Sequence, residues 1–316
     1  MEKRIEIIPY DLSWVKIFET EREAIQSALG ENCLVIHHIG STAVPGLAAK
    51  PKIDMIAEVK DLNFDHKTLQ NLNYEYRGGF NLPFRKNFAY RSPTVDINLH
   101  VFEKNDPEIE LNLVFRDYLR QNDKERDQYA RLKYTLIEDE TSHQLKGEMY
   151  RGYTLGKHNF IQSILQKTGF NRLRIVICTH YTEWDAAKAC RNQYFFVPHG
   201  IDDPYTWTFN HKDHKHLILY QGVEIIGYAH IQLWPEARAA MRIIVIDEDK
   251  RNNNFGSQFL ALCEKWLKSM NIKSLHAESR PTSLKFYEKN GYIAMSFDDP
   301  DGHESDPQDI PVGKIL

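Results

Sequence analysis

Residues 242–260 combine a strand, a polar turn and a helix in an order that suits phosphate binding. The stretch reads Arg242-Ile-Ile-Val-Ile-Asp-Glu-Asp-Lys-Arg-Asn-Asn-Asn-Phe-Gly-Ser-Gln-Phe-Leu260. A turn that opens a helix directs successive backbone N–H groups at one point, at the positive end of the helix dipole, and can hold a pyrophosphate there. Gly256 permits close approach of the backbone, and Ser257 adds a hydroxyl. The alternative is an ordinary strand-to-helix connection, because glycine-containing turns are common before helices.

A second stretch carries aromatic residues on a short helix. It reads Ser274-Leu-His-Ala-Glu-Ser-Arg-Pro-Thr-Ser-Leu-Lys-Phe-Tyr-Glu-Lys-Asn-Gly-Tyr292. The two stretches together resemble the GNAT family of acetyltransferases, whose turn reads Arg/Gln-x-x-Gly-x-Gly/Ala and whose later helix ends in Phe-Tyr-Glu-Lys-x-Gly-Phe/Tyr. Arg251, Gly256 and Ser257 match the turn, and Tyr287 matches the helix tyrosine. Asn254 replaces the first glycine of the turn, and asparagine tolerates a positive φ better than most residues.

The resemblance implies a cofactor and a division of roles. Acetyl-CoA would be the cosubstrate and an amine the acceptor, with direct transfer between them. The main chain of Ile244 and Ile246 would pair with the pantetheine arm, and Tyr287 would protonate the departing thiolate. The alternative for Tyr287 is a packed helix aromatic. The expected cofactor-binding residues include the whole turn and a position that is often Asn or Arg in the family: Arg251, Asn252, Asn253, Asn254, Phe255, Gly256, Ser257 and Arg280.

No general base can be identified from the sequence. The candidates are Glu236, His230, His199 and His303. The histidines of Asn210-His-Lys-Asp-His-Lys-His216 are interpreted as a solvated turn entering a strand rather than as metal ligands, so no metal is expected here. The acidic residues 298–306 are expected to form a solvated loop, although they could attract a cationic amine.

In the first half of the chain, Gly40-Ser41 ends a predicted strand and could hold a phosphate through main-chain N–H groups and the serine hydroxyl. Side chains alternate along a strand, so Asp54 and Glu58 share one face of the next strand. Asp96, Asn98 and His100 likewise share a face of a later strand. Lys50, Arg116 and Arg120, with Arg85 and Lys133, could form an anion pocket; the alternative is a set of helix-surface charges.

This half resembles the GrpB family (UPF0157), a group related to nucleotidyltransferases. The matching segments are Pro9-Tyr10, Trp14, His38-Ile-Gly-Ser-Thr-Ala-Val-Pro-Gly-Leu-Ala-Ala-Lys-Pro51 with Asp54, Asn98-Leu-His100, Phe115–Arg120 and Tyr129–Lys133. Nucleotidyltransferases place an Asp-x-Asp/Glu pair after Gly-Ser to hold two Mg²⁺ ions. Ile56 occupies the place of the second acid, so a weak Mg²⁺ site or none is expected. The resemblance implies a nucleotide or phosphorylated ligand.

The hydrophobic periodicity of the chain predicts two α/β (α+β) domains, at residues 1–168 and 172–316. The resemblances imply a nucleotidyltransferase-like mixed sheet in the first domain and a GNAT mixed sheet in the second. Residues 167–171 would form the hinge. Expected strands are Arg4–Ile8, Leu34–Ile39, Ile53–Val59, Val95–Phe102, Leu173–Cys178, His216–Tyr220, Ile225–Leu233, Arg242–Ile246, Ser274–Glu278 and Tyr292–Phe297. Expected helices are Trp14–Leu29, Leu111–Leu136, Gln144–Gln166, Gly256–Lys268 and Thr282–Asn290.

Composition fits this organisation. The chain has 316 residues, of which 42% are hydrophobic and 27% charged, enough for two packed cores. Residues 1–14 do not resemble a signal peptide, no apolar run could span a bilayer, and the four cysteines form no CxxC pair, so we expect a cytoplasmic protein without a membrane partner. The net charge of -4 gives no reason to expect nucleic acid as the main partner.

Three hypotheses follow. In the first, the second domain acetylates a small-molecule or protein amine, and the first domain binds a nucleotide or phosphorylated ligand that selects or regulates the acceptor. In the second, the main chemistry is metal-assisted nucleotidyl or phosphoryl transfer in the first domain. In the third, the chain is a ligand sensor without turnover. The sequence leaves the acceptor amine and the oligomeric state open.

Overall fold

The computed structural model describes residues 4–146, 149–302 and 306–316, apart from the side chains of 145, 146, 149 and 151. The chain divides into two compact units, one made of Met1–Phe80 and Phe84–Arg172 and the other of Asn81–Pro83 and Leu173–Leu316. The last helix of the first unit ends at Thr168, and Gly169 follows in the left-handed region (φ 70°), where glycine has no steric penalty. Each unit is described by itself.

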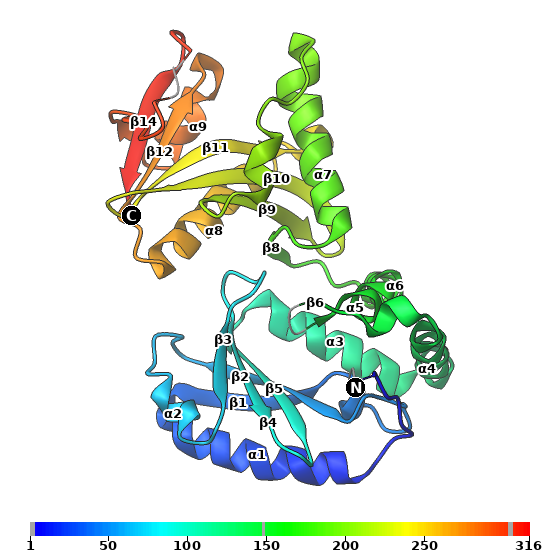
Figure 1. Cartoon of the computed structure of the whole chain (residues 1–316). Coiled ribbons are helices and arrows are strands. Elements are labelled where there is room, and N and C mark those ends of the chain that lie inside the picture. The colour runs from blue at the N-terminus through cyan, green and yellow to red at the C-terminus, as the bar shows by residue number, and fades with distance from the viewer. Residues whose placement is uncertain (1–3, 147–148, 303–305) are drawn as a thin grey trace. The chain divides into compact units, whose positions relative to one another are not determined.

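The first unit is built on a mixed five-stranded sheet with the order β1-β2-β5-β4-β3 (Figure 1). The β2–β5 pair is parallel, and the other neighbours are antiparallel. The strands are β1 Cys33–Ile39, β2 Lys52–Val59, β3 Glu75–Gly78, β4 Lys86–Arg91 and β5 Asp96–Glu103. The helices are α1 Ser13–Leu29, α2 Lys67–Gln70, α3 Pro107–Gln121, α4 Asp123–Glu138, α5 Arg151–Gly156 and α6 His158–Thr168, and a short hairpin pairs β6 Leu145–Lys146 with β7 Met149–Tyr150.

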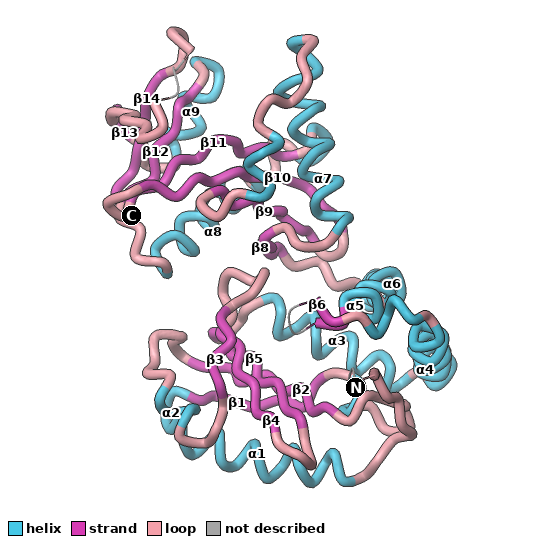
Figure 2. The backbone as a smooth tube through the Cα atoms, in the orientation of Figure 1, coloured by secondary structure: helices cyan, strands magenta, loops and turns pink. Residues whose placement is uncertain are grey.

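Helix α1 covers one face of this sheet (Figure 2). Its Trp14, Phe18, Ile25 and Leu29 pack against alternating residues of β2 and β5, which are Ile53, Met55, Ala57, Val59, Ile97, Leu99 and Val101. Because successive side chains of a strand point to opposite faces, Asp54 and Asn98 lie on the other face. The hydrophobic alternation therefore determines which face carries the polar residues.

The second unit is built on a mixed seven-stranded sheet with the order β13-β14-β12-β11-β10-β9-β8. Only the β11–β12 pair is parallel. The strands are β8 Leu173–Ile177, β9 His214–Gln221, β10 Glu224–Trp234, β11 Arg238–Ile246, β12 Ser274–Ser279, β13 Ile293–Ala294 and β14 Ile310–Ile315. Helices α7 Tyr181–Arg191 and α8 Phe255–Ser269 lie on opposite faces of the sheet, and α9 Leu284–Lys289 follows β12 (Figure 1).

The expected fold class, α/β with two mixed sheets, is confirmed, but several expected elements differ. The long helix expected from Leu111 is broken at Asn122, whose φ of -130° and ψ of 89° are not helical and whose side chain bonds to Tyr118 O at 2.7 Å. Residues 4–8 form only a bridge between Ile8 and Ala49 rather than a strand. Strands β3, β4 and β14 and helix α7 were not expected. Among the described residues, no helix is long and apolar enough to cross a membrane.

Candidate functional site

The two parallel strands of the second sheet separate part way along their length. β11 pairs with β12 from Arg238↔Ser274 to Met241↔Ala277 and no further, whereas its pairing with β10 continues to Gly227↔Ile246. Among the described residues, 242–246 therefore have no strand partner on the side of β12. An unpaired strand edge offers backbone N–H and C=O groups to an extended ligand. Ile244 and Ile246, which the sequence assigned to cofactor binding, lie on this edge.

The turn after β11 leads into α8 with its N–H groups uncapped. Asn252 (φ 65°) and Asn254 (φ 62°) both adopt positive φ, and Asn254 is left-handed at the N-cap of α8 without forming a side-chain cap. Gln258 N donates to Asn254 O at 3.1 Å. Among the described residues, no acceptor bonds to the N–H groups of Gly256 and Ser257, which therefore remain available to an anion.

Two side chains fix the shape of this turn. Arg251 Nε donates to Ile246 O at 2.9 Å, and its guanidinium lies 3.8 Å from a Glu248 carboxylate oxygen. Asn253 Nδ2 donates to the carbonyl oxygens of Lys250 and Arg251 at 3.2 and 3.1 Å. A Cβ on Gly256 would lie 3.2 Å from Cε2 of Phe286, so glycine here allows α8 to start close against α9. Arg280, at the end of β12, is exposed.

Tyr287 lies on α9 and is 6% exposed. Its ring contacts Phe286 and Tyr292 edge to face at 5.2 Å. No partner of its hydroxyl is present among the described residues. Burial raises the pKa of the Tyr287 phenol well above its ordinary value, so the hydroxyl keeps its proton at neutral pH. The group is therefore a proton donor and not a base.

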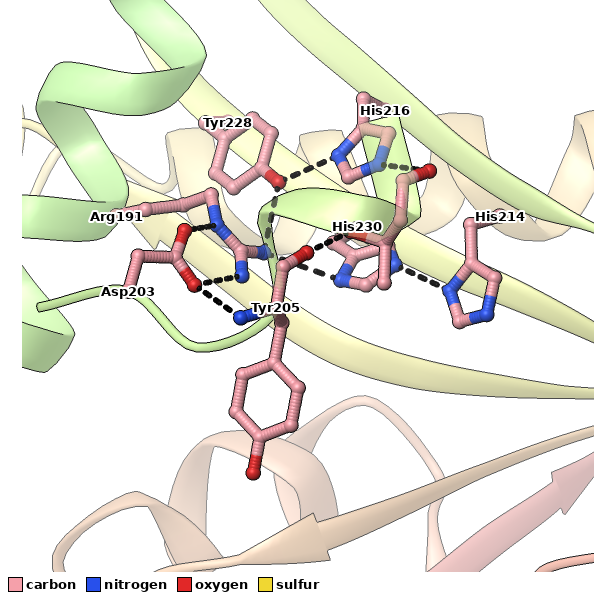
Figure 3. Close-up of polar contacts among 8 residues, drawn as sticks. Arg191, Asp203, Tyr205, His214, His216, Tyr228 and His230 are labelled. Carbon is pink, nitrogen blue, oxygen red and sulfur yellow. Dashed lines mark hydrogen bonds and ion pairs between the residues drawn. The ribbon is translucent and has the colours of Figure 1, made fainter. Parts of the chain in front are cut away.

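A chain of buried polar side chains connects the last residue of α7 with residues of β9 and β10 (Figure 3). Arg191, 1% exposed, forms a bidentate ion pair with Asp203 at 2.6 and 2.8 Å. Its Nη1 also donates to the Tyr228 hydroxyl and to His230 Nδ1, each at 3.3 Å. Such a pair gains geometric specificity from the two parallel bonds.

Three histidines extend this network. His230 Nε2 and His214 Nδ1 are 2.8 Å apart, and His216 joins the Tyr228 hydroxyl at 2.7 Å and Thr208 O at 3.2 Å. Arg191 can only donate hydrogen bonds, and the Thr208 carbonyl can only accept them. These two groups therefore determine which ring nitrogen of His216 and of His230 carries the proton. His230 accepts at Nδ1 and donates from Nε2 to His214, which leaves His214 with its own proton on Nε2. That atom is buried and has no partner among the described residues.

Burial is also the main reason why the pKa values of these histidines are low. It lowers the pKa of His214 and of His216 to about 4 and that of His230 well below its ordinary value. The interpretation of His214 and His216 as part of a solvated turn was wrong, because both are buried residues of β9, 7% and 2% exposed. The polar residues of this strand do not show the hydrophobic pattern of a buried strand, because their side chains form hydrogen bonds inside the network instead of with water.

The other candidate bases differ in their surroundings. His230 has both ring nitrogens engaged. Glu236 and His199 are exposed, on a turn and at the end of a 3-10 helix, and His303 lies outside the described residues. The acidic segment is only partly a solvated loop, because Asp299 pairs with Arg242 and is 4% exposed at its side chain, while Asp301 accepts from Gln232 Nε2 at 2.6 Å.

In the first unit, Gly40 and Ser41 lie where β1 ends, as expected. Gly40 has φ 69° and ψ -168°, a conformation that only glycine adopts readily, and a Cβ there would lie 2.9 Å from Asp54 Oδ2. Arg116 Nη1 donates to His38 O at 2.8 Å, and Arg120 donates to Ala43 O at 2.7 and 2.9 Å. The two arginines thus hold the loop around Gly40 through its carbonyl groups.

The carboxylates of this unit are not arranged as a two-metal clamp. Asp54 accepts from Asn98 Nδ2 at 2.8 Å, its partner across the parallel pair, whereas Asp96 stands opposite Lys52. Ile56, in the place of the second acid, is fully buried. Over residues 4–146, 149–302 and 306–316, no group of three or more His, Cys, Asp or Glu side chains could hold a metal ion.

Sequence reasoning missed Arg191, Asp203 and Tyr228. The available signal was the spacing of His214 and His216 and of Tyr228 and His230, because each pair is two residues apart and so shares one face of a strand. It also missed Lys157, which lies near Lys50 and Asp54.

Comparison with known families gives two matches in tandem. The family model described as GrpB protein matches residues 4–167, and that described as Acetyltransferase (GNAT) family matches residues 184–292. A UPF0157 protein of Halalkalibacterium halodurans is 36% identical over 168 residues, which cover 52% of this chain and 82% of that protein.

Solved structures resemble each half. The conserved protein GrpB from Enterococcus faecalis is 33% identical, with a TM-score of 0.45, and the match covers 52% of this chain and 96% of that one. A putative N-acetyltransferase from Lactobacillus plantarum is 19% identical, with a TM-score of 0.40, and the match covers 46% of this chain and 99% of that one.

Proposed function

We propose that this chain, which belongs to the GrpB family and carries a GNAT-family acyltransferase domain at residues 184–292, transfers an acetyl group from acetyl-CoA to an amine. The observation that carries the proposal is the separation of β11 from β12 beside the uncapped start of α8. A free strand edge and a cluster of free N–H groups are the two features that a pantetheine arm and a pyrophosphate require.

The roles follow from this geometry. The edge at residues 242–246 binds the pantetheine arm, with Ile244 and Ile246 contributing main-chain groups. The N–H groups of Gly256 and Ser257 bind the pyrophosphate, while Asn252, Asn254 and the Arg251 bond to Ile246 O hold the turn in shape. A thioester positioned on this edge can have its carbonyl polarised by a backbone N–H. As the neutral amine forms a bond to the acetyl carbon, the C–S bond breaks and Tyr287 gives its proton to the departing CoA thiolate; the proton that the amine nitrogen then loses restores the neutral phenol.

Binding of acetyl-CoA by the full chain tests the first part of the proposal. Calorimetry of the Gly256→Val variant should show loss of affinity, because the branched side chain crowds the start of α8 where the N–H groups converge. The same side chain would also press on Phe286. A Gly256→Val/Phe286→Leu double variant makes room on that side, so it should regain wild-type thermal stability without regaining affinity. Wild-type affinity in either variant would remove the turn from the site.

Acceptor chemistry tests the second part. The full chain, acetyl-CoA and a panel of primary amines should give N-acetylated product, detected by mass spectrometry. The rival hypothesis of nucleotidyl transfer in the first unit is less well supported, because Ile56 stands where a second carboxylate would be needed. Mg²⁺-dependent turnover of a nucleotide that is lost in Asp54→Asn would favour the rival, and binding of acetyl-CoA without any transfer would favour a sensor.

A further inference from the structure

Lysine side chains from three separate segments gather around two tyrosines in the first unit. The Nζ atoms of Lys50 and Lys157 lie 5.7 Å and 4.5 Å from the ring centroid of Tyr153, and the Nζ of Lys133 lies 4.8 Å from that of Tyr129. Lys50 precedes β2, Lys133 belongs to α4, and Lys157 joins α5 to α6. The fold thus brings together cations that are far apart in the sequence.

This cluster meets the Gly40-Ser41 loop through Lys133. The side chain of Lys133 is 1% exposed and donates to Ser41 Oγ at 3.2 Å and to Ala48 O. An ammonium group has three N–H donors, so one remains. The same loop presents a backbone with no side chain at Gly40, where a Cβ would collide with Asp54.

The charges of the cluster are not balanced. Among the described residues, the ammonium groups of Lys50 and Lys157 form no hydrogen bond or ion pair, and their contacts are the faces of aromatic rings. The negative charge of Asp54 raises the pKa of both lysines. Asp96 also raises the pKa of Lys50, whereas the positive charge of Lys52 lowers it. Burial is the main cause that lowers the pKa of Lys133 to about 7 and those of Lys50 and Lys157 to about 8. An arrangement of this kind is stabilised by an added anion.

We propose that Lys50, Lys133 and Lys157, together with Ser41, bind the phosphate group of a phosphate monoester without a metal ion. A bound anion favours the protonated form of all three lysines; three ammonium groups beside one carboxylate then leave two positive charges, and a phosphate monoester carries nearly two negative charges at neutral pH. Arg116 and Arg120 are not assigned to the site, because three of the five N–H donors of each guanidinium already bond to the carbonyl groups of His38 and Ala43 and to the carboxylate of Asp117, which also compensates part of their charge. This proposal does not depend on the proposed acetyl transfer.

The test is calorimetry of the full chain with three probes, inorganic phosphate, glycerol phosphate and AMP, in the presence of EDTA. Lys157→Gln and Lys50→Gln should each weaken binding about 10- to 100-fold, the range for a hydrogen bond to a charged group. Both variants remove a half-buried charge that has no ion-pair partner among the described residues, and both should keep the wild-type melting temperature. Lys124→Gln, an exposed lysine of the same unit, should bind as the wild type does.

The probes also identify the source of the phosphate. Equal affinity for all three supports a site for free phosphate, and tighter binding of glycerol phosphate or AMP supports a phosphorylated small molecule. The proposal is overturned if none of the probes binds at millimolar concentration, if binding requires Mg²⁺, or if both lysine variants retain wild-type affinity.

Discussion

Asn254 offers a sharp test of the turn that opens α8. Its backbone is left-handed, with φ 62° and ψ 8°, and its side chain does not cap the helix. A residue with a Cβ pays about 1–2 kcal/mol for this conformation, and a β-branched residue is the least suited to it. Asn254→Val should therefore strain the turn, whereas Asn254→Gly should not.

The strain appears in one of two measurements. If the free turn relaxes, acetyl-CoA must restore it on binding, and a cost of about 1–2 kcal/mol weakens Kd about 5- to 30-fold. If the turn is held rigid by Arg251, the same cost appears as lower stability of the second unit. Calorimetry of the full chain with acetyl-CoA measures the change in Kd, and chemical denaturation measures the change in stability.

The matched control is Asn271→Val, because Asn271 is also exposed and has a positive φ of 61° but lies after the end of α8, outside the turn at its start. It should leave Kd nearly unchanged and affect only stability, and Asn254→Gly should bind acetyl-CoA within about twofold of the wild type, well inside the tenfold that 1.4 kcal/mol represents. If Asn254→Val alters neither Kd nor stability, the left-handed turn is not the conformation that binds the cofactor, and the reasoning fails.

Two further predictions concern the buried network. Asp203→Ala leaves the Arg191 charge buried without its partner and should lower the unfolding free energy of the second unit by about 3–5 kcal/mol, whereas Glu224→Ala, which removes an exposed partner of Lys250, should cost at most about 1 kcal/mol in the same denaturation experiment. Equal effects would contradict the burial argument. The low pKa values of His214 and His216 mean that, as pH falls, the unfolded chain binds protons before the folded chain does. The second unit should therefore lose stability as pH falls from about 6.5 to about 4. Nitrogen NMR of the folded chain at pH 6 should find both rings neutral, with the proton on Nε2. Protonation of either ring near pH 6.5 would show that the network is open to water.

The parts of the fold that follow from local periodicity were predictable. The sequence indicated α1, β2, β10 and α8 within a few residues, because their apolar residues recur at strand or helix spacing. It also indicated that Asp54 shares a strand face with Glu58, and Asn98 with Asp96 and His100, and the packing of α1 against the alternate residues agrees. The helix break at Asn122 and the strand β14 depend on tertiary contacts, which periodicity does not report.

In the candidate sites, too, local features could be predicted from the sequence, and features assembled from distant segments could not. A turn such as 251–257 is a local feature, so the sequence identified the start of α8 and the asparagine that adopts a positive φ there. The Arg191 network and the Lys157 contribution are assembled from distant segments, and no spacing rule brings them together. Arg116 and Arg120 show the same limit, since their charge was visible but their carbonyl partners were not.

Amine-dependent release of CoA from acetyl-CoA by the full chain tests the central claim most directly. Wild-type protein should release CoA when a suitable amine is present, and Tyr287→Phe should bind acetyl-CoA normally but lower kcat by about 10²-fold, as loss of a general acid does. Tyr292→Phe, which alters the neighbouring buried tyrosine, should keep the wild-type rate. No amine-dependent release by the wild type would contradict the claim of acetyl transfer, and an unchanged kcat in Tyr287→Phe would leave that tyrosine as a packing residue.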